Sequence, residues 1–394
     1  MRDSSISVLA MARTPFGRFG GALRDVDVRD LGAASIAEAI RRAHVEPGAC
    51  DDVVLGVNFP GSRRSIARQA ALRAGLGDSI NALTVDRACC SSLAAVRMAA
   101  LNLRAGETTL AVAGGAENLS AVPYFLESAR FGSRLGPVVL EDQLVISCPH
   151  TGVPRAVQAA DEAESFGIDR VAQDEWAARS HELYWRALDE DRFAEIFAVT
   201  DENLPGANAL DVDESPRKNV APQTLSALPA VNGSSTVTAG NAPGLSTGST
   251  ALVLAGDAAP EAGEPMARLL AFGTASGPAH QIGQTPAVAA AHALDRAGVK
   301  LADIAAIEIN EAFAAVPLVA TLTLADGDHG VADDLRRRTN CRGGAIAIGH
   351  PTGATGARLI MSAITSLQRR GGGIGLVAIC GGVAEAEAVV LEVA

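Results

Sequence analysis

Two segments of the chain that lie far apart in the sequence share one pattern. Residues 39–56 read AIRRAHVEPGACDDVVLG and residues 293–310 read ALDRAGVKLADIAAIEIN, and the two align without a gap at an offset of 254 residues. Each contains the end of an amphipathic helix, a short turn and an apolar strand. A second echo follows in the same order, with a helical pattern and a strand in residues 91–113 and again in residues 353–380.

Alternating helices and strands are typical of α/β layers with largely parallel strand pairing. Any α/β protein shows single echoes, but two echoes in the same order favour an internal duplication. Residues 119–249 interrupt the first half and are richer in Pro, Asp and Glu. Within them we expect a helix over 169–189 and a loop, punctuated by Pro and Asn, over 203–235. Long excursions of this kind often cover the substrate in α/β enzymes.

Charge and cysteine content narrow the class of protein. The formal net charge of −12 argues against a nucleic-acid binder, which needs a basic face. The six cysteines match no zinc spacing and are too sparse for a disulfide scaffold in 394 residues, so we expect free thiols in a reducing cytoplasm. No stretch approaches the roughly 20 apolar residues of a membrane span. The short apolar run at residues 6–12 is expected to be a first strand rather than a signal peptide.

The first candidate for chemistry is the segment VDRACCSSL at residues 85–93, where a strand pattern gives way to a helical one. A thiol at a helix N-terminus feels the positive end of the helix dipole, which lowers its pKa. The unpaired N–H groups at that end are suited to hold an oxyanion. The alternative is that Cys89 and Cys90 are small buried fillers.

A second candidate is the Gly-rich turn at residues 343–356, which leads into a helical pattern and carries His350 at its bend. The Walker spacing and its lysine are absent, and no G-x-G-x-x-G follows the first strand. An imidazole at this bend is suited to activate a thiol, although a lone histidine is often structural.

Two further candidates end strand patterns. Asn310 and Glu311 follow the apolar run that starts at Ile307, at the strand end where open α/β sheets bind ligands. Asn310 could instead cap a helix. Cys380 ends another strand and is followed by two glycines, and it too could be a buried filler.

The four candidates fall on equivalent loops of two repeated halves, and in this arrangement the sequence resembles the thiolases. The resemblance runs through nearly the whole chain. Its other motifs are ARTPFG at 12–17, ARQAAL at 67–72, AGGAE at 113–117, TAGNA at 238–242, NEAF at 310–313 and GHP at 349–351.

The resemblance implies an α/β fold with a five-layer αβαβα core, built from two repeated βαβαβαββ halves, and a loop domain. We expect the N-terminal half to comprise residues 1–118 and 250–264, the loop domain residues 119–249, and the C-terminal half residues 265–394. Residues 123–136 resemble the loop through which family members form tetramers, so a homotetramer or homodimer is expected.

The resemblance also implies a ping-pong exchange in which Cys89 carries the acyl group as a thioester. The reaction is the reversible cleavage of 3-ketoacyl-CoA by CoA, or the Claisen condensation of acetyl-CoA. His350 would take the thiol proton, Cys380 would shuttle a second proton, and Asn310 would hold a water beside the enolate oxygen. The N–H groups of Cys89 and Gly382 would hold the oxyanion. No metal or cofactor is implied, because CoA is a substrate.

The register of the first motif distinguishes the two adjacent cysteines. Leu93 falls on the leucine of the family pattern Cys-x-Ser-x-Leu, which assigns the nucleophile to Cys89. Cys90 stands where the family usually has glycine and is given no catalytic role.

The chain departs from the family pattern at three places. Val383 and Ala384 follow Gly382 where bare glycine backbone is usual. The family's His-Met-Gly, which touches the acyl group and pantetheine, falls on residues 154–156, which read Pro-Arg-Ala. A basic residue near the CoA adenine is replaced at about Asn232, and Pro243 replaces the serine of the following turn. These changes keep two alternatives open: a thiolase-like binding or scaffold subunit without turnover, and a C–C bond-forming enzyme with an unusual acyl donor.

Overall fold

The computed structural model describes the chain except for residues 1–4, 133, 146, 192 and 257–263. The strands are β1 (Ile6–Arg13), β2 (Gly17–Arg18), β3 (Asp52–Gly56), β4 (Asn81–Val85), β5 (Leu110–Asn118), β6 (Ser246–Ala255), β7 (Ala267–Ser276), β8 (Ile304–Ile309), β9 (Gly373–Cys380) and β10 (Glu385–Val393). The α-helices are α1 (Val28–Ala43), α2 (Ile66–Arg73), α3 (Ser91–Ala105), α4 (Arg155–Ser165), α5 (Arg170–Asp191), α6 (Pro222–Ser226), α7 (Gln284–Ala297), α8 (Ala315–Leu324), α9 (His329–Arg338), α10 (Ala345–Ile348) and α11 (Thr355–Gln368).

The order of the strands in the sheet reflects the internal duplication of the sequence. Strands run in the order β4-β3-β5-β6-β1-β7-β10-β9-β8, and β2 pairs with β6. Each half begins with a strand (β1 or β7) that lies beside the joint between the halves, where Ile6 pairs with Leu269. In both halves the outer strands pair in parallel, β3 with β4 and β5, and β8 with β9. A single parallel bridge from Ile307 to Thr339 stands where β4 would have its counterpart.

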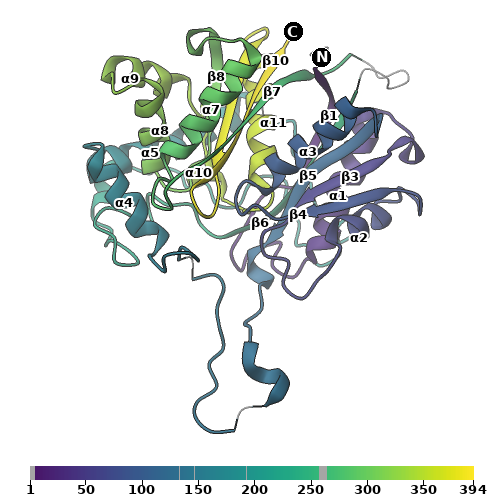
Figure 1. Ribbon diagram of the computed structural model, residues 1–394, viewed down its shortest axis with the longest axis horizontal. Coiled ribbons are helices and arrows are strands. Elements are labelled where there is room, and N and C mark those ends of the chain that lie inside the picture. The colour runs from purple at the N-terminus through teal and green to yellow at the C-terminus, as the bar shows by residue number, and fades with distance from the viewer. Residues whose placement is uncertain (1–4, 133, 146, 192, 257–263) are drawn as a thin grey trace.

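The helices and strands form the five layers expected from the resemblance. Figure 1 shows α3 and α11 between the two halves of the sheet, with α1 and α2 outside one half and α7 and α8 outside the other. One apolar cluster joins the central helices to strands of both halves and includes Leu93, Ile360, Val54 and Val377. Burial of this continuous surface is the main driving force for docking the halves. The expected first strand is confirmed as β1.

The excursion leaves after β5 and returns at β6. Because Asn118 pairs with Thr247 across these antiparallel strands, the excursion starts and ends at one place in the sheet. It contains the expected helix as α5 and, within the expected loop, the short helix α6. β6 begins at Ser246 and therefore crosses the domain boundary expected at residue 250. Residues 257–263 of the expected N-terminal half lie outside the described residues.

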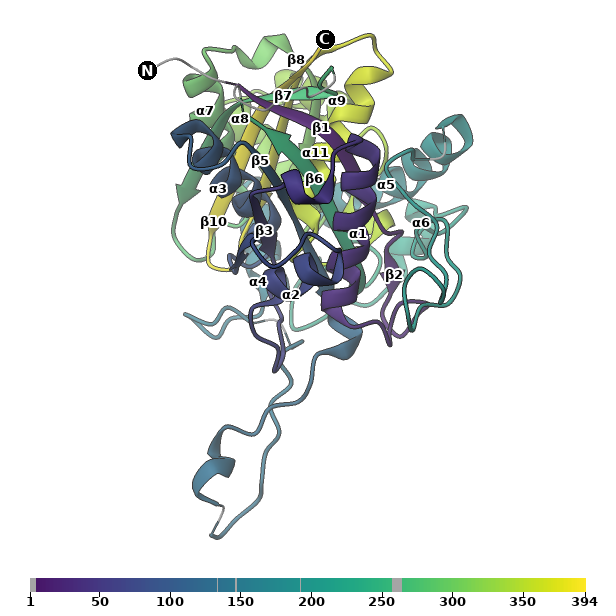
Figure 2. The same ribbon diagram turned by 90° about the vertical axis from the view of Figure 1, so that its right-hand side faces the viewer.

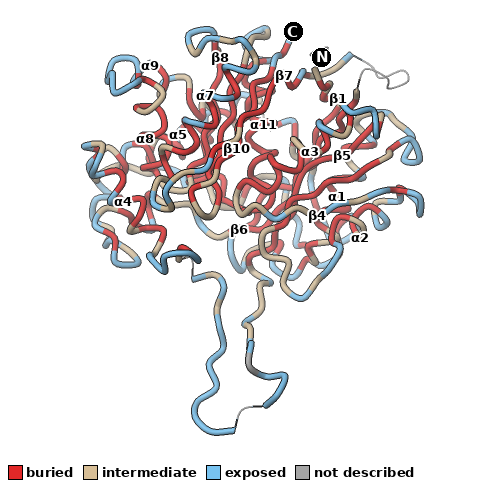
Figure 3. Tube along the Cα trace, in the orientation of Figure 1, coloured by how far each residue is buried: buried red, intermediate tan, exposed pale blue. Residues whose placement is uncertain are grey.

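Part of the excursion extends far from the body as two long arms of chain (Figures 1 and 2). This segment is exposed along most of its length, whereas the central strands are buried (Figure 3). It carries large apolar side chains in solvent, with Phe131 exposed by 94% and Leu135 by 97%. Among the described helices, none is long and apolar enough to cross a bilayer.

Candidate active site

The residues singled out from the sequence lie on loops at the ends of strands or helices. Cys89 follows β4 and immediately precedes the α3 region, Asn310 follows β8, and Cys380 is the last residue of β9. His350 lies in the turn between α10 and α11. The tips of α3 and α11 meet closely, because the Ala357 N–H donates to Ser92 Oγ at 3.0 Å and no Cβ could be added to Gly356 without meeting Leu93.

A tight turn presents Cys89. Ala88 has a φ of +48°, in the left-handed region that alanine rarely adopts. The Ser91 hydroxyl locks the turn by accepting from the Arg87 N–H at 2.8 Å and donating to the Ala88 carbonyl at 2.6 Å. Strain of this kind persists only where the surroundings impose it, and it is found preferentially at functional sites.

The electrostatic state of Cys89 differs from the sequence expectation. The helix dipole was expected to lower its pKa, but burial, followed by the charge of Glu117, raises the pKa of the Cys89 thiol to about 12. Desolvation of the thiolate outweighs the dipole because Cys89 precedes the helix in a poorly solvated site. The resting nucleophile is a neutral thiol that needs a base during the reaction.

Cys90 occupies a different environment. Its Sγ is buried and lies 3.3 Å from the Ile379 carbonyl oxygen, to which it donates. It packs against Gly381, where an added Cβ would lie 3.1 Å from Sγ. Cys90 therefore fills space between the two halves.

The hydrogen bonds of His350 determine which nitrogen carries the proton. Its Nδ1 lies 2.7 Å from Thr355 Oγ1, and the Thr355 hydroxyl donates to the Pro351 carbonyl at 2.9 Å. A hydroxyl has one proton, so Thr355 must accept from His350, which places the proton on Nδ1. Nε2 keeps its lone pair and lies 3.5 Å from Asn310 Nδ2. Burial, aided by the positive charge of Arg358, lowers the pKa of His350 to about 3, so the ring is neutral.

Asn310 is placed by the backbone of β9. Its N–H donates to the Ala378 carbonyl at 3.0 Å, and the residue is fully buried. Its Oδ1 is buried without a hydrogen-bond partner among the described residues, so this oxygen is available to a ligand. The alternative that Asn310 caps a helix is wrong, since α8 begins only at Ala315 and its N-cap is Ala314.

The loop after Cys380 approaches the loop of Cys89. Burial raises the pKa of the Cys380 thiol well above its usual range. A Cβ on Gly382 would lie 2.9 Å from the Ala88 Cβ, so only glycine fits there without a shift. Ala384 has a φ of +48°, which gives a physical reason for the glycine that the family pattern has in this loop.

Two residues that position the site received no role from the sequence. Thr355 fixes the orientation of the His350 ring through its hydroxyl. The sequence feature that could have identified it is a hydroxyl side chain at the first position of the helix that follows the His350 turn. Glu117 joins the halves, because its carboxylate accepts from the N–H groups of Asn58, Phe59 and Gly353 at 2.9–3.1 Å. The sequence shows a carboxylate two residues after Gly114-Gly115, but its burial and its partners appear only in the structure.

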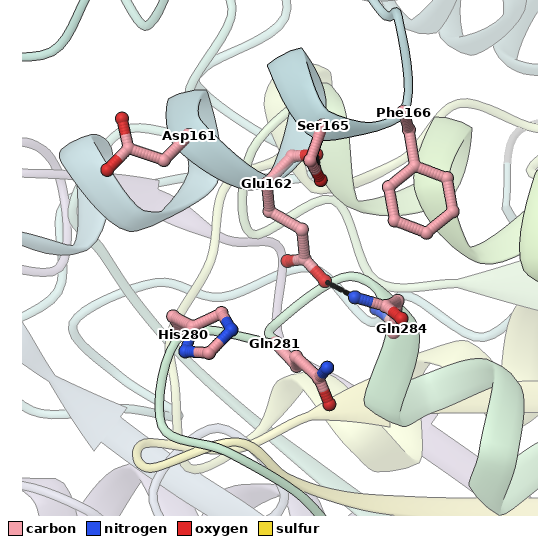
Figure 4. A pocket seen from close by; sticks show the side chains of 7 residues that line it. All are labelled: Asp161, Glu162, Ser165, Phe166, His280, Gln281 and Gln284. Atoms are coloured by element: carbon pink, nitrogen blue, oxygen red, sulfur yellow. Dashed lines mark hydrogen bonds between the residues drawn. The ribbon is translucent and has the colours of Figure 1, made fainter.

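A hollow of about 480 Å³ lies between α4 and the start of α7 (Figure 4). It is lined by Asp161, Glu162, Ser165, Phe166, His280, Gln281 and Gln284. Glu162 accepts from the N–H groups of Gly283 and Gln284 and from the Gln284 side chain at 2.7–3.1 Å. None of the four candidate catalytic side chains lines the hollow. The Glu162 carboxylate in its wall caps the N-terminus of α7.

Comparison with known proteins agrees with this architecture. Residues 6–258 match the family model described as thiolase, N-terminal domain, and residues 263–393 match thiolase, C-terminal domain. The chain is 37% identical to an acetyl-CoA acetyltransferase of Escherichia coli, covering 98% of each, and 38% identical to a beta-ketoadipyl-CoA thiolase of Pseudomonas knackmussii, covering 96% of this chain and 97% of the other. The crystal structure of the Bacillus anthracis acetyl-CoA acetyltransferase superposes with a TM-score of 0.93 at 34% identity and 99% coverage of both chains.

Proposed function

The chain belongs to the thiolase family and is an acyltransferase, and on that premise we propose that Cys89 carries the acyl group between CoA thioesters. The substrates are 3-ketoacyl-CoA and CoA in one direction, and acyl-CoA and acetyl-CoA in the other. The observation that carries the proposal is the neutral His350, whose unprotonated Nε2 faces the Asn310 amide.

In the cleavage direction, His350 Nε2 accepts the proton of the Cys89 thiol as sulfur attacks the keto carbon. The bond between the keto carbon and the α-carbon breaks, and its electron pair forms the enolate of acetyl-CoA. Cys380 gives its proton to the α-carbon, which releases acetyl-CoA and leaves an acyl thioester on Cys89. The CoA thiol then gives its proton to Cys380 as its sulfur attacks that thioester. His350 returns the first proton to Cys89, which restores both thiols.

Two groups stabilise the developing negative charge. The N–H groups of Cys89 and Gly382 hold the oxyanion of the tetrahedral step, and each such donor contributes roughly 3–4 kcal/mol by comparison with other oxyanion holes. The free Oδ1 of Asn310 orders a water beside His350 at the enolate oxygen. The loop of Gly382 lies against Ala88, the residue before Cys89, and this supports an oxyanion site shared by the Cys89 and Gly382 N–H groups.

The experiment is mass spectrometry after incubation with acetyl-CoA or acetoacetyl-CoA. We expect an acyl adduct on Cys89, retained in Cys90→Ala and lost in Cys89→Ser. An acyl group on another residue, with Cys89 free, would refute the proposal. A subunit without turnover is the alternative, and a second assay excludes it: the purified chain should cleave acetoacetyl-CoA in the presence of CoA.

The extended arms suggest how copies assemble. Phe131 and Leu135 are almost fully exposed, and large apolar side chains in water favour burial against another chain. We infer that this segment joins copies of the chain into a homodimer or homotetramer. The expected loop includes Ser133, which lies outside the described residues.

A further inference from the structure

Arg155 is a buried cation with an incomplete set of partners. It is the first residue of α4, and only 8% of its surface is exposed. One guanidinium nitrogen, Nη1, donates to Gln158 Oε1 at 2.7 Å and lies 3.5 Å from the Ala279 carbonyl. The other, Nη2, is buried and has no hydrogen-bond partner in the part of the chain that the structure describes. Within the described residues, no carboxylate forms an ion pair with it.

The start of α4 packs close to the Cys380 loop. Ala156, the next residue of α4, belongs to the same apolar cluster as Cys380. Arg155 also reaches Ala279 in the loop after β7, and in that loop the Gly277 N–H donates to the Ala384 carbonyl at 2.9 Å, beside the Cys380–Gly382 turn. Burial dominates the pKa of both Cys89 and Cys380, and the positive charge of Arg155 opposes the rise at each.

Burying a cation without a paired anion is unfavourable in free energy. A guanidinium can form two parallel hydrogen bonds to a carboxylate, so a carboxylate is a well-matched partner. Of the three carboxylates on α4, Asp161 and Glu164 are exposed, and Glu162 already accepts three hydrogen bonds at the start of α7. Among the described residues nothing supplies the missing anion, so the Arg155 guanidinium is available to an anionic ligand. The phosphates of CoA are separated from the reacting thioester by the whole pantetheine arm, whereas the far end of a short acyl chain is not.

We propose that Arg155 binds a carboxylate at the distal end of the acyl group, so that this enzyme prefers 3-ketoacyl-CoA thioesters of dicarboxylic acids. The inference rests on the proposed function and specifies its substrate class. Arg155 acts on specificity and takes no part in bond breaking. During cleavage the acyl group retained on Cys89 would be the half that bears the carboxylate.

The test compares two substrates of equal chain length, 3-ketohexanedioyl-CoA and 3-ketohexanoyl-CoA, which differ in a terminal carboxylate or methyl. For the wild-type enzyme we expect kcat/KM to favour the dicarboxylic substrate by about 100-fold, the effect of one charged hydrogen-bonded contact. Arg155→Met, which keeps an unbranched apolar side chain, should remove this preference and raise activity on the neutral substrate. Arg155→Lys should keep part of it.

Three outcomes would overturn the inference. A wild-type ratio near one would do so without any variant, which guards against misfolding of Arg155→Met. An equal loss on both substrates in Arg155→Met would assign the side chain to a group that both share, such as a CoA phosphate. Acetyl-CoA, which has no distal carboxylate, tests the proposed function separately: if it leaves Cys89 unmodified, the proposed function fails and the inference falls with it.

Discussion

Replacing Thr355 with valine removes one oxygen atom and leaves the shape of the side chain nearly unchanged. In the native site that oxygen accepts from His350 Nδ1 and donates to the Pro351 carbonyl, at 2.7 Å and 2.9 Å. Thr355 is fully buried, so water has no direct access to replace it. In Thr355→Val the proton of His350 can move to Nε2, where it blocks acceptance of the thiol proton.

The size of the effect follows from the group left without a partner. The Pro351 carbonyl keeps its bonds from the Ala354 and Thr355 N–H groups, so only His350 Nδ1 loses its partner. A buried group that loses its partner costs about 1–3 kcal/mol, so the free energy of unfolding should fall by about that amount. Groups that orient a functional histidine typically change activity by about 10–100-fold, so kcat should fall within that range. KM should change less, since Thr355 lies behind the imidazole.

The assay is steady-state cleavage of acetoacetyl-CoA by CoA across a pH series, with urea unfolding on the same preparations. Thr355→Ser keeps the hydroxyl and is the matched control, with kcat expected within a few-fold of wild type. A merely structural role would lower stability and leave the pH profile of kcat unchanged. If Thr355→Val retains wild-type kcat and pH profile, the assigned tautomer of His350 is wrong.

Three other perturbations have defined outcomes. Gly382→Ala puts a Cβ 2.9 Å from that of Ala88, so kcat should fall at least about 10-fold as the oxyanion loop shifts; unchanged kcat would separate this loop from catalysis. Burial raises the pKa of Glu308 to about 8 from an ordinary 4.5, so its contribution to stability is full below about pH 4.5 and is lost as pH rises through about 8. Glu308→Gln should flatten that fall in urea unfolding at pH 5 and pH 8, and an equal fall would contradict the reasoning. Leu135→Asp should lower the mass of the assembly in size-exclusion chromatography with light scattering; an unchanged mass would place the interface elsewhere.

The secondary structure that frames the site could be predicted because it depends on local patterns. The apolar runs that become β8 and β9 end at Ile309 and Cys380, and this places Asn310 and Cys380 at strand ends before any coordinates are known. The repeat at an offset of 254 residues predicts the matching strand orders of the two halves. The exact return point of the excursion was harder to predict, because β6 begins within a polar stretch whose partner strands, β2 and β5, are distant in the sequence.

The tertiary structure decided properties that arise from atoms distant in the sequence. The local motif favoured a lowered pKa for Cys89, but burial by segments from both halves raises it. The proton on His350 depends on how the turn folds back onto Thr355, and the placement of the Arg155 guanidinium depends on a contact with a loop 124 residues away. Sequence patterns therefore determined which side chains reach the site. Desolvation and hydrogen-bond geometry exist only in the packed chain, and they determined the protonation of these side chains and which polar atoms are left for a ligand to bind.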